Sequence, residues 1–549
     1  MSIDGVSGRT SYIGSGILNL RSQLDTLTEQ LASGKVSNTY AGQGAGRSLA
    51  LGLRAQLNSY SAYADTATNV NTRISVANLS LQRLVAVTSS VKGAAVSAGS
   101  TLDNTGQTAG QKTASLGFFD SVDMLNAKAG DRYLFGGRAT DAPPVASADQ
   151  ILNGSGTAIA GLKQVIAERL QADLGVNLNG RIGSAVPAAP ASQSSVVVTE
   201  EELTPAPPAA AQPFGMKVSG VSTTIVGATV TQPATLPTTV PPTPAVPPAA
   251  KSMSIDLGTV IPQEGDTVKF TLQMPDGTSE DIVMTATTTA KTPMDANTFL
   301  IDPGNPQAVP PVAPSSAVTA ANLNTALATS MKSLANGTMA AASAIQAGQN
   351  FFDQPPMRVG GGPAFNASTT LVAGTKADTV IWYTGESDTT AGQTDSARGT
   401  AVAQVDTGTT VQYGARANEQ ALRTELQNVA VFAAVTTKVS PTGTPPVTAL
   451  NAGDKISALN QRIAQNLAVI PGTQSIQNIQ ADFAGAQASI KSTTDRQNQS
   501  KVISQSLLDS IEGVDNNEVA TKILALQTAL QASYQTTSDL YKMSLVKFL

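Results

Sequence analysis

Apolar residues recur at helical spacing near both ends of this 549-residue chain. In "ILNLRSQLDTLTEQLASGK" successive apolar residues of the stripe are alternately three and four positions apart. This is the seven-residue repeat of a helix that packs along one side. The members of this first seam are Ile17, Leu20, Leu24, Leu27 and Leu31. Ser33 and Gly34 predict where this helix ends, because glycine readily adopts the left-handed conformation that follows a helix.

A second and longer seam follows a loop, "SNTYAGQGAG". Its members are Val70, Ile74, Ala77, Leu81, Leu84, Thr88, Val91 and Ala95. A third helix is expected over about 108–128. After it comes "RYLFGG", in which the aromatic and apolar side chains are expected to pack while the glycines let the backbone turn. We therefore interpret Tyr133, Leu134, Phe135, Gly136 and Gly137 as a structural corner.

The last predicted helix begins at "GVDNNE", where Asp515 or Asn516 can accept a hydrogen bond from a free backbone amide. Its apolar and small residues repeat every 11 positions, which favours a straight or slightly right-handed arrangement. The three rows are Val519, Leu530 and Tyr541; Ile523, Tyr534 and Leu545; and Leu526, Thr537 and Phe548. Leu540 and Leu549 extend this apolar surface.

These stripes need partners, since isolated helices are marginally stable in water. We expect the two helical ends to pair with each other. The outermost residues then bury either in a groove of the same chain, the usual solution, or in neighbouring copies. We favour neighbouring copies, because apolar stripes occupy both end segments. The predicted subunit interface is Ile17, Leu20, Leu24, Leu27, Leu31, Ile74, Leu81, Leu84, Ile523, Leu526, Leu530, Leu540, Tyr541, Leu545, Phe548 and Leu549.

The middle of the chain has a different composition. Residues 183–250 are rich in Pro and Ala and are interpreted as an extended linker. "TVKFTLQMPDGTSEDIVMTAT" alternates apolar and polar residues around a turn at Pro275–Gly277, which predicts a hairpin. "ADTVIWYTG" predicts a strand, "GTAVAQVDTGTTVQYG" a hairpin and "ARANEQALRTELQNVAVFAAVT" a helix.

The predicted fold class is therefore a multidomain α+β fold with β-rich central inserts and terminal helices paired in a coiled-coil-like bundle. The predicted parts are a helical core over 1–140, a connecting segment over 141–182, the linker over 183–250, an α+β insert over 251–350, a second β-rich insert ending in a helix over 351–450, and a second helical core over 451–549.

Composition excludes several classes of function. Charged residues make up 13% of the chain and the net charge is −5, against ~25% charged residues in typical domains. No basic cluster predicts nucleic-acid or anionic-membrane binding. The chain contains neither Cys nor His, so it lacks the commonest general base and metal ligand. We expect no enzyme activity, cofactor or metal site.

Targeting signals are not evident either. The first residues lack a basic stretch followed by an apolar one, which a cleavable secretory signal requires. No run of about 18 apolar residues predicts a membrane span. By these rules alone the chain is expected to be soluble and cytoplasmic.

Three motifs together resemble the bacterial flagellin family. "LTEQLASGKVSN" (27–38) resembles its N-terminal signature, and "LNAKAGDRYLFGG" (125–137) resembles the branch found at the hook–filament junction, hook-associated protein type 3. "ALQTALQASYQTTSDLYKMSLVKFL" resembles the last helix of that branch. The resemblance covers about residues 10–140 and 455–549. The family's Asp-rich loop after the first helix is replaced here by "YAGQGAGRS".

The resemblance implies a structural subunit of the flagellum that serves swimming motility. Its terminal helices would form a core that stacks with copies and other axial subunits, namely hook-associated proteins and flagellin. It implies type III export without a cleavable signal, an extracellular location, and an export chaperone that covers residues near 519–549. The large middle region keeps a main filament flagellin open as an alternative. A secreted surface adhesin or enzyme with coiled-coil ends is a more remote alternative.

Overall fold

The computed structural model describes residues 4–97, 99, 101–156, 158–189, 191–201, 213–233, 251–386, 396–439, 447–448 and 451–546. The chain combines helices with several small sheets and divides into two compact units. Unit 1 contains Met1–Thr72, Val402–Gln412 and Ala484–Leu549, and unit 2 contains Arg73–Ala401 and Tyr413–Phe483. This agrees with a mixed, multidomain α+β chain. The coiled-coil packing of the two ends stays a prediction.

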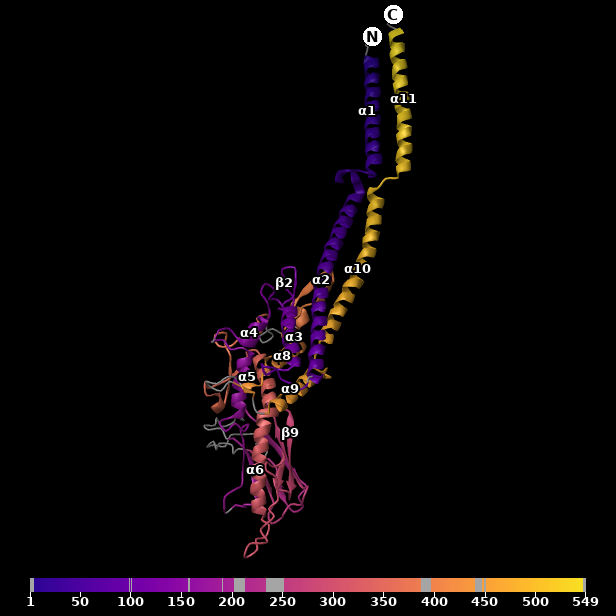
Figure 1. Cartoon of the computed structure of the whole chain (residues 1–549). Helices are drawn as coiled ribbons and strands as arrows, with labels where there is room; N and C mark the ends of the chain where they lie inside the picture. Colours follow the sequence, from indigo (N-terminus) through magenta and orange to yellow (C-terminus); the bar gives the residue numbers. More distant parts are fainter. Residues whose placement is uncertain are drawn as a thin grey trace, which may run out of the picture. The chain divides into compact units, whose positions relative to one another are not determined.

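Unit 1 is built mainly from long helices. Its elements are α1 (Asp4–Ser33), η1 (Tyr40–Gly46), the first part of α2 (Arg47–Ser97), β13 (Val402–Asp406), β14 (Thr409–Gln412), most of α10 (Ile476–Glu512) and α11 (Asn516–Val546). α1 and α11 run side by side (Figure 1). The hairpin predicted from "GTAVAQVDTGTTVQYG" is confirmed, because β13 and β14 pair antiparallel.

Three predicted helix boundaries in the terminal regions are confirmed. α1 ends at Ser33, and Gly34 follows with φ +66° while its amide donates to Gln30 O at 2.8 Å. α3 (Ala109–Leu125) begins with a reciprocal cap between Thr108 and Gln111. α11 begins after Asp515, whose carboxylate accepts from the amide of Asn517 at 2.8 Å.

Unit 2 contains the remaining helices and most of the strands. Its helices are the rest of α2, α3, α4 (Ala148–Asn153), α5 (Leu162–Leu174), α6 (Ser316–Leu334), η2 (Ala335–Met339), α7 (Ala340–Phe351), η3 (Phe365–Ala367), η4 (Ala397–Thr400), α8 (Gln420–Ala434), α9 (Ala452–Asn466) and the start of α10. α3 contacts α8, and the side chain of Gln111 donates to Phe432 O and Val435 O at 3.0 and 2.7 Å.

Two four-stranded sheets share one hydrophobic core with α6. The first has the order β10-β9-β8-β5 and the second the order β3-β4-β7-β6. Their strands are β3 (Ile182–Ala185), β4 (Ser195–Glu200), β5 (Lys217–Thr223), β6 (Thr229–Thr231), β7 (Ser252–Asp256), β8 (Thr267–Gln273), β9 (Ser279–Thr287) and β10 (Thr298–Leu300). The predicted hairpin around Pro275–Gly277 is confirmed, because β8 and β9 pair antiparallel.

The remaining strands form short pairs. They are β1 (Lys128–Ala129) with β2 (Arg132–Tyr133), β11 (Met357–Val359) with β12 (Leu371–Ala373), and β15 (Lys438–Val439) with β16 (Val447–Thr448). The strand predicted around Trp382 is wrong. Only isolated bridges form there, such as Tyr383 with Val145, and the Trp382 indole N–H donates to Phe352 O at 3.1 Å within an aromatic cluster.

The interpretation of 183–250 as an extended linker is wrong for much of its described part. β3 to β6 lie in this range, and the alternating residues Val196, Val198, Val218 and Val221 are buried in the shared core. Residues 202–212 and 234–250, which carry most of the Pro-rich stretches, lie outside the described residues. The predicted inserts over 251–350 and 351–450 also differ from the structure, which places most of both in unit 2 together with residues 141–201.

Among the described residues, no helix is long and apolar enough to cross a membrane, and no group of three or more acidic side chains is arranged to hold a metal ion.

Candidate assembly site

The first seam lies on the less exposed side of α1. Ile17, Leu20, Leu24 and Leu27 are half-buried, while most positions between them are exposed. α1 contacts α11, and both helices belong to unit 1. The predicted seam therefore marks the side of α1 that the chain covers in part, whereas Leu31 stays exposed.

α11 has a matching stripe. Val519 and Leu530 are buried, and Ile523 and Leu526 are half-buried, so the covered positions follow steps of four, three and four residues. Two members of the predicted 11-residue rows, Tyr534 and Tyr541, are exposed instead. The shielding thus follows a seven-residue rather than an 11-residue spacing in this part of the helix.

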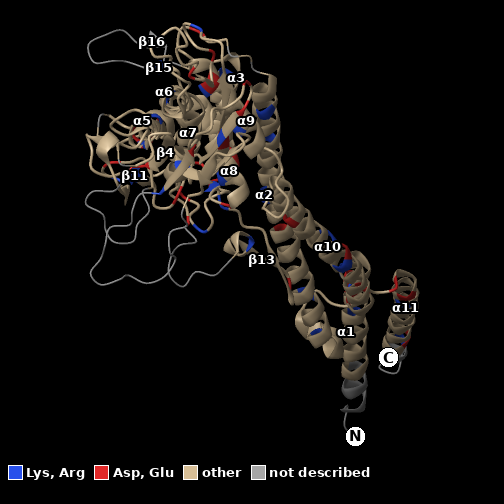
Figure 2. Ribbon diagram, turned by 90° about the horizontal axis from the view of Figure 1, so that it is seen from below, with Lys and Arg blue, Asp and Glu red and all other residues tan. Residues whose placement is uncertain are grey.

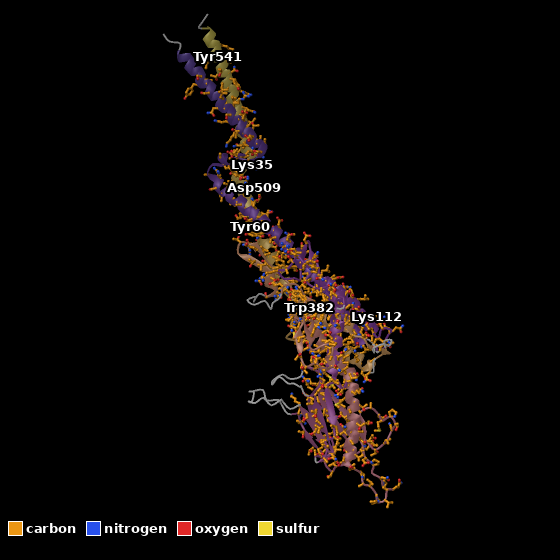
Figure 3. The ribbon with its side chains drawn as sticks, turned by 90° about the vertical axis from the view of Figure 1, so that its left-hand side faces the viewer. Lys35, Tyr60, Lys112, Trp382, Asp509 and Tyr541 are labelled. Atoms are coloured by element: carbon orange, nitrogen blue, oxygen red, sulfur yellow. The ribbon has the colours of Figure 1, made fainter. Side chains whose placement is uncertain are left out.

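The two connections between successive long helices of unit 1 are joined by backbone hydrogen bonds. Between α1 and η1, the Val36 amide donates to Glu512 O at 2.7 Å. Between α10 and α11, the Val514 amide donates to Gly34 O at 3.1 Å, and the Gly513 amide donates to Asp509 O. Lys35 and Gly513 form the isolated bridge between these segments, and Figure 3 shows Lys35 close to Asp509 there. This joint therefore holds the C-terminal end of α1 beside the N-terminal end of α11.

A salt bridge and a small apolar cluster support the joint. The Arg54 guanidinium donates to the Glu512 carboxylate at 2.6 Å, and the side-chain amide of Gln43 donates to it at 3.1 Å. These contacts, with the Arg54 bond the strongest, hold the pKa of Glu512 below its usual value. Beside them a cluster forms from Ala50, Leu53, Leu57, Leu508 and Ile511.

Large apolar side chains remain exposed on the outer surfaces of these helices. Leu18 is 69% exposed, Ile503 68% and Leu524 64%. The exposed apolar residues of α1, α10 and α11 are Tyr12, Leu18, Leu31, Val502, Ile503, Leu507, Leu524, Tyr534, Leu540 and Tyr541. We call this set the outer apolar residues. Contiguous exposed apolar patches mark interaction sites in soluble proteins, whereas apolar residues exposed singly are ordinary.

α11 contains one long stretch without charge. No charged residue lies between Lys522 and Asp539 of α11, and α1 and α11 are drawn mostly in the colour of uncharged residues in Figure 2. Many hydroxyls bond back to their own helix: Thr28 donates to Leu24 O, and Thr528 donates to Leu524 O, at 2.7 and 2.8 Å. These polar groups therefore need no partner outside the helix.

The predicted interface residues of the second seam need a correction. Ile74, Leu81 and Leu84 are fully buried within the chain itself, so they cannot form the contact surface of a neighbouring copy. They belong to unit 2, where α3 lies close to the same helix: a Cβ on Gly117 would stand 2.9 Å from Val87. Leu84 lies about one helical turn before Val87.

The structure sorts the other predicted interface residues into three groups. Leu31, Leu540 and Tyr541 are exposed and remain available to a partner. The seam residues of α1 and α11 named above are shielded in part by their own chain. The side chains of Leu545, Phe548 and Leu549 lie outside the described residues. Sequence reasoning missed Leu18 and Leu524 because it followed a single seam on each of their helices. It missed Val502 and Ile503 because it traced no seam in that part of the chain.

The corner after α3 has the predicted structural character. Phe135 is fully buried, Gly136 and Gly137 are buried, and Tyr133 is half-buried. Gly137 has φ +64°, a conformation that side chains strain, and a Cβ there would stand 2.6 Å from a Glu386 carboxylate oxygen. Gly136 leaves no room for a Cβ either, since the Ala139 carbonyl oxygen stands too close. Both glycines are therefore required by the backbone path.

Unit 2 also buries an acid, Glu425, that forms no salt bridge with any described residue. Glu425 on α8 accepts a hydrogen bond from the Ser121 hydroxyl at 3.1 Å, and its second oxygen, Oε2, has no hydrogen-bond partner among the described residues. Burial raises the pKa of Glu425 to about 8, which the hydrogen bond from the Ser121 hydroxyl only partly counters. Glu425 is therefore protonated and uncharged at neutral pH, and the uncharged form is the one that costs least to bury.

Two buried amines have the opposite shift. Burial lowers the pKa of Lys455 on α9 to about 8, and its ammonium donates to Thr436 O at 3.1 Å. Burial also lowers the pKa of Lys217 on β5 to about 8, although Glu200 partly counters it. Both amines are buried within unit 2, so their shifted pKa values bear on the stability of that unit.

Comparison with known proteins adds no family assignment. No protein-family model matches the chain, and no curated protein matches it.

Proposed function

We propose that the chain is a structural subunit of the bacterial flagellum, a flagellin-family protein of the hook–filament junction. The observation that carries the proposal is the set of outer apolar residues on α1, α10 and α11, which the chain leaves exposed. The flagellin-like motifs at 27–38 and 125–137 and in the last helix support the same assignment. The absence of Cys and His from the sequence disfavours an enzyme.

In this proposal, α1 and α11 pair in a coiled-coil-like manner through their half-buried seams. Their outer surfaces then pack against copies and against other axial subunits. Burying a large apolar side chain contributes about 1.5–3 kcal/mol. A contact that covers five of them therefore offsets much of the 4–15 kcal/mol that association costs, by an order-of-magnitude estimate. The paucity of charge on α11 favours such burial, because few ions would lose water.

Export and location follow from the same assignment. The subunit leaves the cell through the flagellar type III channel and acts outside it, and an export chaperone covers α11 before secretion. The outer apolar residues Leu524, Tyr534 and Tyr541 give such a chaperone an apolar surface on that helix.

A main filament flagellin is the second candidate, because the region between the terminal helices is large. Immunogold electron microscopy of detached flagella, with an antibody to residues 251–435, separates the two. Label confined to the hook end supports the junction protein, and label along the whole shaft supports the filament flagellin. Flagella without label would refute the proposal and leave the surface adhesin as the favoured alternative.

The assembly surface can be tested separately in cells that lack the native copy. Leu540 and Tyr541 are exposed, so replacing both by Asp leaves unit 1 folded but adds charge to the outer surface of α11. We expect export without incorporation into flagella. Ser538→Asp is the matched control, since it adds charge at an exposed polar position of the same helix. Normal incorporation of the double variant would exclude this part of α11 from the interface.

A further inference from the structure

The edge of one sheet in unit 2 is only partly covered. β9 pairs with β8 along Ser279–Thr285, whereas β10 pairs only with Thr285–Thr287. Among the described strands, none pairs with the outer edge of Ser279–Met284. Uncovered strand edges present backbone groups that can pair with another chain.

The register shows which backbone groups face outward. At the turn, the Met274 amide donates to Thr278 O at 2.7 Å, so the alternate β9 residues Glu280 and Ile282 exchange hydrogen bonds with β8. The peptide groups of Asp281 and Val283 then point away from β8. Thr285, the next residue in this series, donates outward to Asn297 O at 2.9 Å. Within the described chain, no hydrogen-bond acceptor is found for the amides of Asp281 and Val283.

Glu280, Asp281 and Ile282 of this edge line a cleft of about 950 Å³, and Val283 lies just beyond its lining in sequence. The other walls come from α6, η2, α9, and β10 with the loop before it. Short side chains line the α6 wall: Asn322, Thr325, Ala326, Thr329, Ser330 and Ser333. Phe299 is the one aromatic residue that lines this cleft, and it is fully buried in the core. A wall of short side chains opposite a free strand edge leaves room for an extended peptide.

The charges of the cleft are mainly negative. Four carboxylates line it, against one amine, Lys291. Three of the carboxylates already have cations: Glu280 has Arg462 at 3.3 Å, Asp281 has Lys269 at 3.2 Å, and Asp295 has Lys291 at 2.5 Å. The fourth, Asp454 at the start of α9, has no salt bridge among the described residues. A basic side chain is the complement of this wall.

We propose that this cleft binds an extended segment of another polypeptide, which adds to the free edge of β9 and places a Lys or Arg beside Asp454. The backbone groups of Asp281 and Val283 supply the affinity, and Asp454 supplies the selectivity for a basic residue. The free part of β9, Ser279–Met284, spans about 17 Å at the usual rise, so the bound segment is about six residues long. This binding activity is separate from the assembly surface of unit 1.

The test uses the full chain and a fluorescein-labelled TKVKVT peptide, with binding followed by fluorescence anisotropy. Val283→Pro removes one outward amide without removing a β8–β9 hydrogen bond, and proline is tolerated at sheet edges. We expect this variant to weaken binding at least tenfold. Val283→Ala, which keeps the amide and trims a side chain that is 41% exposed, is the matched control and should bind like the natural chain.

Two further measurements keep the test decisive if the proline variant unfolds. A TKVKVT peptide methylated on alternate backbone nitrogens should bind at least tenfold more weakly to the natural chain, because it cannot donate to the strand edge. Asp454→Asn should weaken TKVKVT but not the neutral peptide TQVQVT. Absence of TKVKVT binding, or equal binding of the methylated peptide, would overturn strand addition. Equal effects of Asp454→Asn on both peptides would overturn the role given to Asp454.

Discussion

Replacing the buried acid Glu425 by Gln should change how the stability of unit 2 depends on pH. Glu425 has an ordinary pKa of 4.5 when exposed, and burial raises the pKa to about 8 in the folded chain. Between these values the folded chain holds a proton that the unfolded chain has lost. Its contribution to stability is therefore complete below about pH 4.5 and is lost as the pH rises to about 8.

The size of the effect follows from the shift. One pKa unit corresponds to about 1.36 kcal/mol, so a shift from 4.5 to about 8 corresponds to on the order of 5 kcal/mol. Over pH 5 to 8 the natural chain should lose on the order of 4 kcal/mol. Glu425→Gln keeps the shape and an oxygen that accepts from Ser121, but it has no proton to lose. Its stability should stay nearly constant over this range.

The composition makes the measurement unusually clean. The chain has no His, so few other groups titrate between pH 5 and 8, and its single Trp, Trp382, lies in the same unit as Glu425. Urea unfolding followed by Trp382 fluorescence at pH 5, 6, 7 and 8 therefore reports unit 2. Glu518→Gln, at an exposed position of α11, is the matched control and should keep the natural slope. An unchanged slope in Glu425→Gln would refute the reasoning.

Lys455→Met should stabilise the chain at pH 7 by up to roughly 3 kcal/mol, because it removes a buried amine whose pKa is lowered to about 8. This gain in the free energy of unfolding should shrink as the pH rises from 8 to 10.5, and a gain that stays constant in urea titrations at both pH values would contradict the reasoning. Glu512→Gln should loosen the joint of unit 1, more at neutral than at acid pH, because Arg54 holds the pKa of Glu512 low. Hydrogen exchange of the Val36 and Val514 amides measures the loosening, and equal protection of these amides in the variant and the natural chain would contradict the prediction. Gly137→Ala should cost at least about 1–2 kcal/mol from its left-handed backbone, measured as a lower Tm, with Gly130→Ala, also at positive φ but free of close contacts, separating strain from crowding.

Sequence patterns predicted the helical elements well because each pattern is local. The spacing of Leu20, Leu24 and Leu27 identifies the covered side of α1, and Asp515 identifies the first residue before α11. The β8–β9 hairpin follows from alternation on both sides of one turn. These features depend on neighbours within a few residues, which a sequence displays directly.

Features that depend on distant partners were missed. β3 and β4 lie in a segment that composition assigned to a linker, because Pro and Ala around them concealed the alternation of Val196 and Val198. The seam of Ile74 and Leu81 was assigned to neighbouring copies, whereas the chain buries these residues itself. An apolar stripe predicts that a surface is covered, but it does not identify what covers it.

The hydroxyls that bond back to their own helix have a consequence for how copies could align. Thr28, Thr528 and Thr537 each satisfy a hydroxyl within α1 or α11, and α11 has a charge-free stretch between Lys522 and Asp539. A neighbour packed along such a stretch meets methyl groups, apolar side chains and exposed glutamine amides, but no charge that demands one particular partner. Sliding it by one helical turn would exchange similar contacts for similar contacts. Two axial registers would then differ little in free energy, so the assembled lattice could shift between them without breaking.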